Sequence, residues 1–391
     1  MIKYFSANYI FPVSTEPLKD GVVSVNDQGE IVKIFDRDAA ESITDTVERH
    51  EGIIVPGFVN SHCHLELSHM HQTLPKGQGL ISFINAVLKE RQDDEAVITA
   101  AMEKADKTMF DNGIVAVGDI SNNILSKKVK QKSKLYYHTY VEVMGFNPEK
   151  AEEAFEKGLA LKEEFYPLSS SVTPHSAYSV SKELFKSFRN YSEDKENLFS
   201  LHNQETEEEN KLYRYKTGAF LDFYKSLGLD VEFFKPQARN SVQSIIPLLP
   251  KEQKILLVHN IYTSLKDIYF VRRFGRDITW CFCPNANLYI ENRLPKLDMF
   301  LPHDFNMTIG TDSLASNDKL SILSELITLS KAFPSIPLST TLKWATLNGA
   351  KFLGIDSDIG SIERGKKPGL NLIADTQGIK LSEKSTVKRL I

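Results

Sequence analysis

The chain has 391 residues, of which 41% are hydrophobic and 25% charged, as in an ordinary globular protein with a substantial core. Its formal net charge of −4 leaves no basic surplus to neutralise phosphates, which argues against a nucleic-acid partner. Three cysteines build no disulfide framework, and no run approaches the roughly 20 apolar residues that span a bilayer. With no apolar signal segment at the N-terminus, we expect a cytoplasmic protein without membrane contact.

The N-terminal segment, residues 1–54, is predicted to consist of short strands. Two β-prone runs, 22–25 and 30–35, flank the turn-forming cluster 26–29, which indicates a β-hairpin. Such a small set of strands does not close a core by itself. We therefore expect this segment to pair with strands from elsewhere in the chain.

A run of apolar and β-prone residues, 53–59, leads to two histidines one residue apart, His62 and His64. On a strand, residues i and i+2 point to the same face, so both imidazoles would project together. Two neutral imidazoles at this separation suit a metal such as zinc. Taken alone, the pair is equally well explained as two unrelated strand histidines.

Beyond this stretch, short apolar runs alternate with stretches of helical spacing as far as residue 352. The helical stretches are 80–112, 148–164, a helix capped by Ser181, 212–227, 265–274, a loose 285–297 and 320–333. The predicted strands are 113–120, 136–143, 171–175, 199–202, 254–259, 278–283 and 307–312. Counting the opening strand, this alternation predicts an α/β fold, a (β/α)8 TIM barrel over residues 55–352, a size near the roughly 250 residues such barrels need.

The C-terminal segment, residues 353–391, returns to strand character at 370–374 and 386–390, with glycines between the runs. We expect it to join residues 1–54 in one small β-sandwich beside the barrel.

Ionisable residues fall at the ends of the predicted strands. His62 and His64 end the first strand, and the others follow the same pattern: His175 ends the fourth, His202 the fifth, His259 the sixth and Asp312 the eighth. In a barrel these carboxyl ends converge on one rim, where active sites of this fold are built. The sequence therefore predicts a shared metal site on that rim.

These motifs resemble the amidohydrolase superfamily. The resemblance is carried by Pro-Gly-Phe-Val-Asn-Ser-His-Cys-His at 56–64, His-Asn-Gln-Glu at 202–205, His259, and Gly-Thr-Asp-Ser-Leu-Ala-Ser-Asn at 310–317. It covers nearly the whole chain, including the return segment 353–366. The most similar branch is the mononuclear deaminases and chlorohydrolases that act on aminated purines, pyrimidines and triazines.

The resemblance and the chemistry together imply one divalent metal ion held by His62, His64, His202 and Asp312. Zinc is expected, and iron is the alternative because it also accepts imidazole and carboxylate. The fourth predicted strand reads Thr-Pro-His-Ser-Ala at 173–177, without the lysine that bridges two metals in other relatives. One ion is therefore expected, and it would lower the pKa of a bound water to about 7.

Three residues are expected to move protons or stabilise charge. Asp312 could accept the proton of the attacking water, and His259 could hydrogen-bond the nucleophile. By resemblance, Glu205 would protonate a ring nitrogen of an amidine-like substrate; one member of a solvated acidic helix face is the alternative for this residue.

Four residues are assigned to substrate contacts. His175 and Tyr178 resemble a His-Ala-Pro-Tyr segment of the deaminase branch, although Ala177 stands where that segment has proline. Glu66 is expected either to contact the substrate or to form a structural salt bridge. Asn317, at the end of the strand-eight motif, completes the set.

The function that follows is hydrolytic deamination of a purine-like or nucleoside-derived heteroaromatic amine, with aminofutalosine-type compounds among the candidates. A chlorohydrolase or a cyclic-amide hydrolase on the same scaffold is the enzymatic alternative. A non-catalytic assembly protein is the remaining one, and the intact ligand set speaks against it. A small-molecule substrate is expected, and a homodimer is left open.

Overall fold

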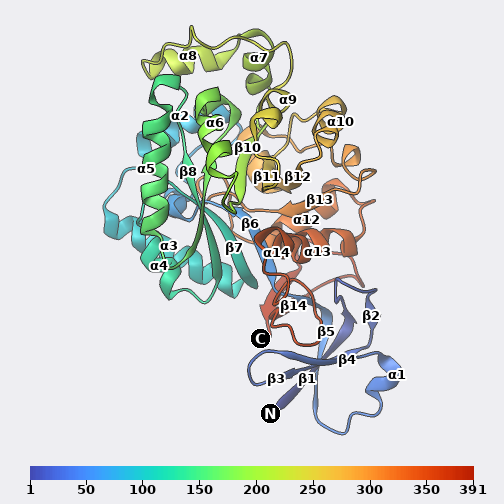
Figure 1. Ribbon diagram of the computed structural model, residues 1–391. Coiled ribbons are helices and arrows are strands. Elements are labelled where there is room, and N and C mark those ends of the chain that lie inside the picture. Colours follow the sequence, from blue (N-terminus) through green and yellow to red (C-terminus); the bar gives the residue numbers. More distant parts are fainter.

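The computed structural model describes all residues from Met1 to Ile391. Its centre is a ring of parallel strands, made of two four-stranded sheets in the orders β6-β7-β8-β9 and β10-β11-β12-β13 (Figure 1). Their bounds are Phe58–Cys63 (β6), Ile114–Ser121 (β7), Tyr136–Val143 (β8), Ser169–Pro174 (β9), Phe199–Asn203 (β10), Lys254–His259 (β11), Asp277–Phe282 (β12) and Asn306–Ile309 (β13).

Two seams close the ring, and each carries a single parallel bridge. At the β9–β10 seam Ser176 bridges to His202, and at the β13–β6 seam Cys63 bridges to Asp312. The amide of His202 donates to the carbonyl of His175 at 2.9 Å, and the amide of Asp312 donates to the carbonyl of His62 at 3.1 Å. The predicted (β/α)8 barrel is therefore confirmed.

Helices follow the strands and surround the ring (Figure 1). The α-helices are α2 (Leu80–Glu90), α3 (Glu95–Asp111), α4 (Lys127–Lys132), α5 (Ala151–Glu164), α6 (Lys182–Tyr191), α7 (Glu207–Tyr215), α8 (Ala219–Ser226), α9 (Ser241–Ile245), α10 (Leu265–Arg273), α11 (Pro284–Glu291), α12 (Ile322–Ala332), α13 (Leu338–Ala345) and α14 (Leu347–Leu353). Short 3-10 helices are η1 (Leu65–Met70), η2 (Pro148–Lys150), η3 (Ala177–Ser179), η4 (Ile246–Leu248) and η5 (Leu297–Met299). Ser181 caps α6 as expected, because its side chain accepts from the amide of Leu184.

Both ends of the chain meet in one seven-stranded sheet below the barrel (Figure 1). Its strands are β1 (Ile2–Ile10), β2 (Leu18–Lys19), β3 (Val22–Asn26), β4 (Ile31–Phe35), β5 (Val47–Pro56), β14 (Leu370–Ala374) and β15 (Thr386–Arg389), with the short helix α1 (Arg37–Ala40) after β4. The predicted hairpin is the antiparallel pair β3–β4. Strand β14 pairs with β5, so the C-terminal segment completes the unit begun by the N-terminal one, around its own apolar core.

The apolar run 53–59 was expected to form one strand leading to His62, but it is divided between two sheets. Its first half belongs to β5 of the terminal sheet, and only Phe58 and Val59 belong to the barrel strand that leads to His62. Gly57 lies between the two strands, where a Cβ would come within 2.6 Å of the carbonyl oxygen of Pro368 and closer still to Val115. The chain can turn from one sheet into the other only where no side chain is present.

The predicted helix 212–227 also differs, because two helices cover this region. Helix α7 ends at Tyr215, where Lys216 takes a left-handed conformation, and α8 begins after Gly218 at φ +100°. The apolar spacing runs through both helices and therefore hides the break.

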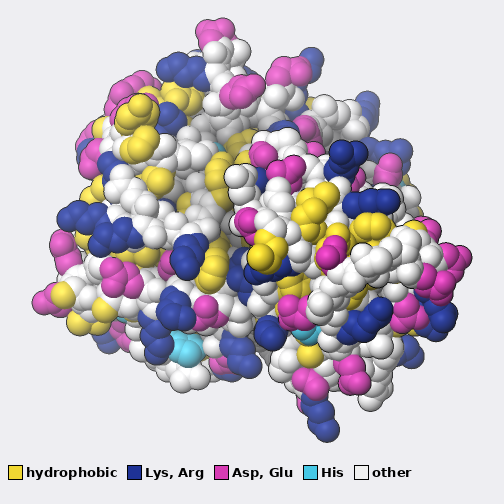
Figure 2. Space-filling model, turned by 90° about the horizontal axis from the view of Figure 1, so that it is seen from below, with side chains coloured by type: hydrophobic (Ala, Val, Ile, Leu, Met, Phe, Trp, Pro, Cys, Tyr) yellow, Lys and Arg dark blue, Asp and Glu magenta, His cyan; other side chains and the backbone are white.

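No helix of the structure is long and apolar enough to cross a membrane. On the face shown in Figure 2, acidic and basic side chains are intermingled, without a broad basic field of the kind that binds nucleic acid.

Candidate metal centre and active site

Four side chains converge at the carboxyl ends of β6, β10 and β13. One potential ligand atom each from His62, His64, His202 and Asp312 lies within 4.8 Å of the other three, and all four residues are buried. These are the four residues that the sequence assigned to the metal. The strands β6, β10 and β13 are far apart in the sequence, and closure of the ring brings their carboxyl ends together.

The spacing of the ligand atoms fits a small tetrahedral ion. The Nε2 atom of His64 lies 3.1 Å from that of His62 and 3.2 Å from that of His202. Asp312 Oδ1 lies 3.3 Å from His64 Nε2 and 3.6 Å from His62 Nε2. Ligands at the 2.0–2.1 Å typical of zinc–imidazole bonds would be separated by about 3.3 Å in a tetrahedron.

Hydrogen bonds from the second ring nitrogen orient two of the imidazoles. The Nδ1–H of His202 donates to the carbonyl of His175 at 3.0 Å, which leaves the Nε2 lone pair free for a cation. The Nδ1 of His62 lies 3.3 Å from Ser200 Oγ. No hydrogen bond reaches Nδ1 of His64, whose ring packs against those of His62 and His202.

Burial sets the protonation of these groups. It lowers the pKa of His64 to about 3, an effect that the neighbouring histidines reinforce and Asp312 opposes. Burial also lowers the pKa of His202 well below its ordinary value. For Asp312, burial alone would raise the pKa, but the hydrogen bond from His62 and the charges of His64 and His259 hold it well below the usual range. Neutral imidazoles and an ionised carboxylate are the forms that bind a divalent metal.

The backbone is tightly fitted where β13 meets β6. A Cβ at Gly310 would lie 2.8 Å from both the Cβ and the carbonyl oxygen of His62, so only glycine allows this approach. Asp312 and His259 both have positive φ, at +58° and +73°. Non-glycine residues in this region are uncommon, and here they aim two functional side chains into the site.

Glu205 and His259 face each other beside the ligands. His259 Nε2 lies 3.7 Å from Glu205 Oε1, and its Nδ1–H donates to Asn287 Oδ1 at 2.8 Å. Burial, with added repulsion from Asp312 and Glu291, raises the pKa of Glu205 well above its ordinary value. Glu205 is thus a buried carboxyl whose surroundings favour the protonated form, and it does not belong to a solvated acidic face.

A cavity of about 760 Å³ opens over the ligands and gives them access to a small molecule. His64, His202, Glu205, His259 and Asp312 line its deep end. Its sides are formed by an apolar wall from α2, α5, α8 and the residues after α8, namely Leu80, Phe83, Ile84, Val87, Leu88, Leu161, Phe223, Leu227 and Leu229.

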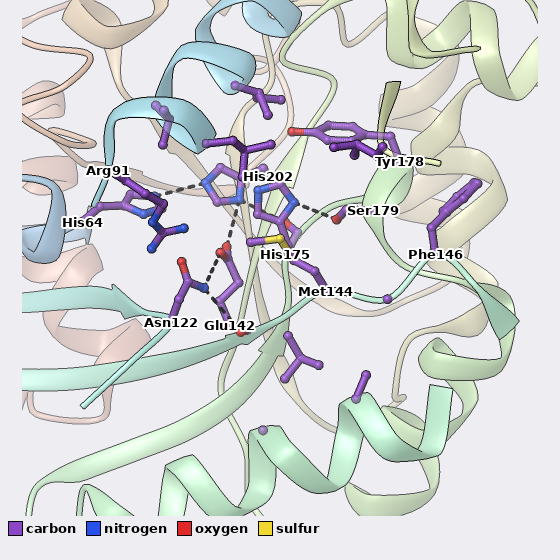
Figure 3. Close-up of a pocket in the computed structure, with 18 of the residues that line it drawn as sticks. His64, Arg91, Asn122, Glu142, Met144, Phe146, His175, Tyr178, Ser179 and His202 are labelled. Carbon is purple, nitrogen blue, oxygen red and sulfur yellow. Dashed lines mark hydrogen bonds and ion pairs between the residues drawn. The ribbon is translucent and has the colours of Figure 1, made fainter. Parts of the chain in front are cut away.

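Two of the four residues assigned to substrate contacts line this cavity. His175 receives or donates a hydrogen bond at Nδ1 with Ser179 Oγ at 2.7 Å, and its ring lies 4.7 Å from that of His202 (Figure 3). Tyr178 lies beside it, with ring centroids 5.6 Å apart.

The other two residues lie outside the cavity. Glu66 accepts from Arg91 at 2.9 Å and from the amide of Asn122 at 3.0 Å, which is the ion-pair alternative considered for it. Asn317 is placed differently from the expectation, because its amide nitrogen donates to the carbonyl of Thr311 and to Glu325, each at 2.8 Å. It braces the loop after β13 and has no contact with the cavity.

Glu142 and Asn122 are residues at the cavity to which the sequence assigned no role. Glu142 Oε1 lies 3.4 Å from Nδ1 of His202, and Asn122 Nδ2 donates to Glu142 Oε2 at 3.0 Å (Figure 3). A signal for Glu142 was present, since it is the one charged residue in the otherwise uncharged stretch 136–143. A charge near the end of a buried strand indicates a functional or paired group.

Known proteins with similar sequences and structures are amidohydrolases and deaminases. The chain matches the Amidohydrolase family over residues 53–389. An adenosine deaminase from Helicobacter pylori is 27% identical over 82% of this chain and 78% of its own length. An aminodeoxyfutalosine deaminase from Nitratiruptor is 28% identical over 85% of this chain and 82% of its own. The structure of Helicobacter pylori aminofutalosine deaminase in complex with methylthio-coformycin has a TM-score of 0.82 at 24% identity, covering both chains completely.

The chain therefore belongs to the amidohydrolase family. This confirms the family resemblance stated from the motifs, and with it the expectation of a hydrolase that acts on carbon–nitrogen bonds other than peptide bonds. One divalent metal ion, with zinc as the best fit to three imidazoles and one carboxylate, is its cofactor.

Proposed function

We propose that this protein is a metal-dependent deaminase of a purine nucleoside that carries an exocyclic amine, and that it releases ammonia by hydrolysis. The single observation that carries this proposal is the buried carboxyl group of Glu205, which faces His259 beside the four metal ligands. An amidine-like ring needs such a proton donor before water can attack its carbon. The relatives named as deaminases of adenosine and aminodeoxyfutalosine support the same substrate class.

The residues His62, His64, His202 and Asp312 would hold the ion. When bound, a divalent zinc ion lowers the pKa of water to about 7 and so supplies a nucleophile at neutral pH.

Glu205 would donate its proton to the ring nitrogen next to the amine-bearing carbon. Burial and the charges of Asp312 and Glu291 raise its pKa and so favour the protonated, donating form. Protonation leaves the adjacent carbon electron-poor and ready for attack. After attack, the proton that Asp312 took from the water could pass to the departing amine, so that the carbon–nitrogen bond breaks and ammonia leaves.

Asp312 and His259 would act on the attacking water. Asp312 is ionised and can accept a proton, while Ser316 Oγ donates to its Oδ2 at 2.6 Å and fixes the carboxylate plane. Because His259 gives its Nδ1–H to Asn287, its Nε2 remains an acceptor directed at the reacting groups.

A substrate panel tests the proposal. Zinc-loaded protein is incubated with adenosine, 5′-deoxyadenosine, methylthioadenosine, aminodeoxyfutalosine, guanine, a chlorinated triazine and a cyclic amide, while ammonia, chloride and ring-opened product are measured separately. We expect ammonia from at least one purine nucleoside and no chloride from the triazine. Chloride release without ammonia would establish the chlorohydrolase alternative. Ring opening of a cyclic amide with neither product would establish the amidase alternative.

We further propose that the protein works in the cytoplasm. Its three cysteines, Cys63, Cys281 and Cys283, are free and buried, which suits a reducing compartment. A homodimer stays a prediction that sedimentation analysis can test.

A further inference from the structure

A lysine from outside the strand ring has its whole side chain buried beside β7. Lys130 lies on α4, and its Nζ is 2.7 Å from Asp119 Oδ2, with both side chains fully shielded from solvent. The same ammonium donates to Ser121 Oγ and Thr139 Oγ1, each at 3.0 Å. All three of its hydrogens are therefore used, and the ion pair is complete.

The second oxygen of Asp119 reaches the loop that follows the metal ligands. Asp119 Oδ1 accepts a hydrogen bond from the amide of Leu65 at 2.7 Å, and Leu65 is the residue next to His64. Leu65 begins η1, whose preceding residue, His64, offers no side-chain cap. The Asp119 carboxylate supplies the acceptor that this helix start needs.

His64 depends on this contact more than the other imidazole ligands do. His202 and His62 have Nδ1 contacts, to the carbonyl of His175 and to Ser200, whereas no hydrogen bond reaches Nδ1 of His64. Its Nε2 nevertheless lies centrally, within 3.3 Å of three other ligand atoms. Its position therefore depends on the backbone around residue 64 and on packing against the rings of His62 and His202.

We propose that Asp119 is a positioning residue for the metal centre: its Oδ1 fixes the peptide after His64, while Lys130 compensates the charge of the buried carboxylate. Neither residue lines the cavity, so neither touches the substrate. The inference rests on the metal centre that the proposed function also uses. Partners of this kind typically change metal affinity by about 10–100-fold.

Two double variants of the full chain separate this role from ordinary structural support. Both remove the two charges together, so that no unpaired charge is left buried. Asp119→Asn with Lys130→Met keeps an acceptor oxygen for the Leu65 amide. Asp119→Leu with Lys130→Met removes that acceptor. Asp106→Asn is the control, since Asp106 accepts from Ser133 and Tyr137 nearby without touching the ligand loop.

Zinc affinity is measured by competition with a chromophoric chelator, and thermal melting is followed with and without metal. We expect the asparagine variant and the control to stay within about threefold of the parent, and the leucine variant to lose roughly 10–100-fold in affinity. If the leucine variant does not fold, Asp119→Val with Lys130→Met replaces it, because valine suits a strand. The absorption spectrum of cobalt-substituted protein should change only in the variant without the acceptor.

Equal zinc affinities in the leucine and asparagine variants would overturn the inference, whether both match the parent or both fall below it by the same factor. This failure is distinct from failure of the proposed function. A parent protein that binds zinc tightly but releases no ammonia would refute the deaminase proposal and leave the positioning role intact.

Discussion

The metal end of the cavity and its apolar wall are built from different elements. The ligands and Glu205 stand at or just after the ends of β6, β10 and β13, where strand pairing fixes the backbone. The wall comes from α2, α5 and α8, and several of its members are partly exposed, with Leu88 46% and Leu227 47% accessible. The comparison indicates that the chemistry is held by the rigid ring, while the choice of substrate is left to helices that can vary independently.

Removing a group from the metal end should have the largest effect. Asp312→Ala deletes a ligand and a proton acceptor together, so we expect kcat/KM to fall by more than about 10⁴-fold, the upper range for general-base loss. Metal content by atomic absorption should fall in parallel. Asp318→Ala is the matched control, because this nearby aspartate is 52% exposed and pairs only with Lys76. An active Asp312→Ala protein would remove the basis for treating this end as catalytic.

Glu205→Gln should have the next largest effect. Glutamine keeps the shape but has no acidic proton, so kcat should fall by about 10²–10⁴-fold while metal content stays unchanged. Glu207→Gln, on the more exposed first turn of α7, should remain within about twofold of the parent. Loss of metal from Glu205→Gln would show that the residue supports metal binding, and it would contradict the proposed role as proton donor.

The pH profile gives an independent view of the same residue. Because the pKa of Glu205 is raised, the protonated, donating form persists to higher pH than in an exposed glutamate and is lost as pH rises through that pKa. Activity should therefore decline on the alkaline side, measured as log kcat against pH. The decline should be absent from the residual activity of Glu205→Gln. An unchanged alkaline limb in that variant would assign the titration to another group.

The apolar wall should give the smallest effect and a different kinetic signature. Leu227→Ala removes cavity-lining apolar surface, so KM should rise about 3–10-fold while kcat stays the same. Leu265→Ala is matched to it, since this leucine is 43% exposed on α10 and lies outside the cavity. A fall in kcat for Leu227→Ala, with KM unchanged, would break the distinction between the two regions.

The same difference explains what could be predicted from the sequence. Each functional strand appears as an apolar run that ends in a histidine or aspartate, so His175, His202, His259 and Asp312 could be located without coordinates. A buried parallel strand must be apolar on both faces, which makes an ionisable residue at its end conspicuous. The closed ring then brings these strand ends together, regardless of the sequence and length of the loops.

Other features leave no such trace. The wall is made of ordinary leucines, valines and phenylalanines whose helical spacing is the same as that of core residues. The division of run 53–59 between two sheets depends on space around Gly57, which involves Pro368 more than 300 residues later. The brace formed by Asn317 and Glu325 likewise depends on tertiary contacts. Its asparagine looked like a substrate ligand because it follows the strand-eight motif.

The two seams of the barrel have a consequence for how the protein gains and loses its ion. The amides of His202 and Asp312 make seam hydrogen bonds, while the side chains of the same residues are ligands. A bound ion thus links β6, β10 and β13 and crosses the β13–β6 seam, whereas β9 contributes no ligand. Because the ion would tie Asp312 to His62 and His64, its removal should loosen the β13–β6 seam. Hydrogen exchange at the amides of Asp312 and His202, compared with and without zinc, would measure how far the ion holds each seam closed.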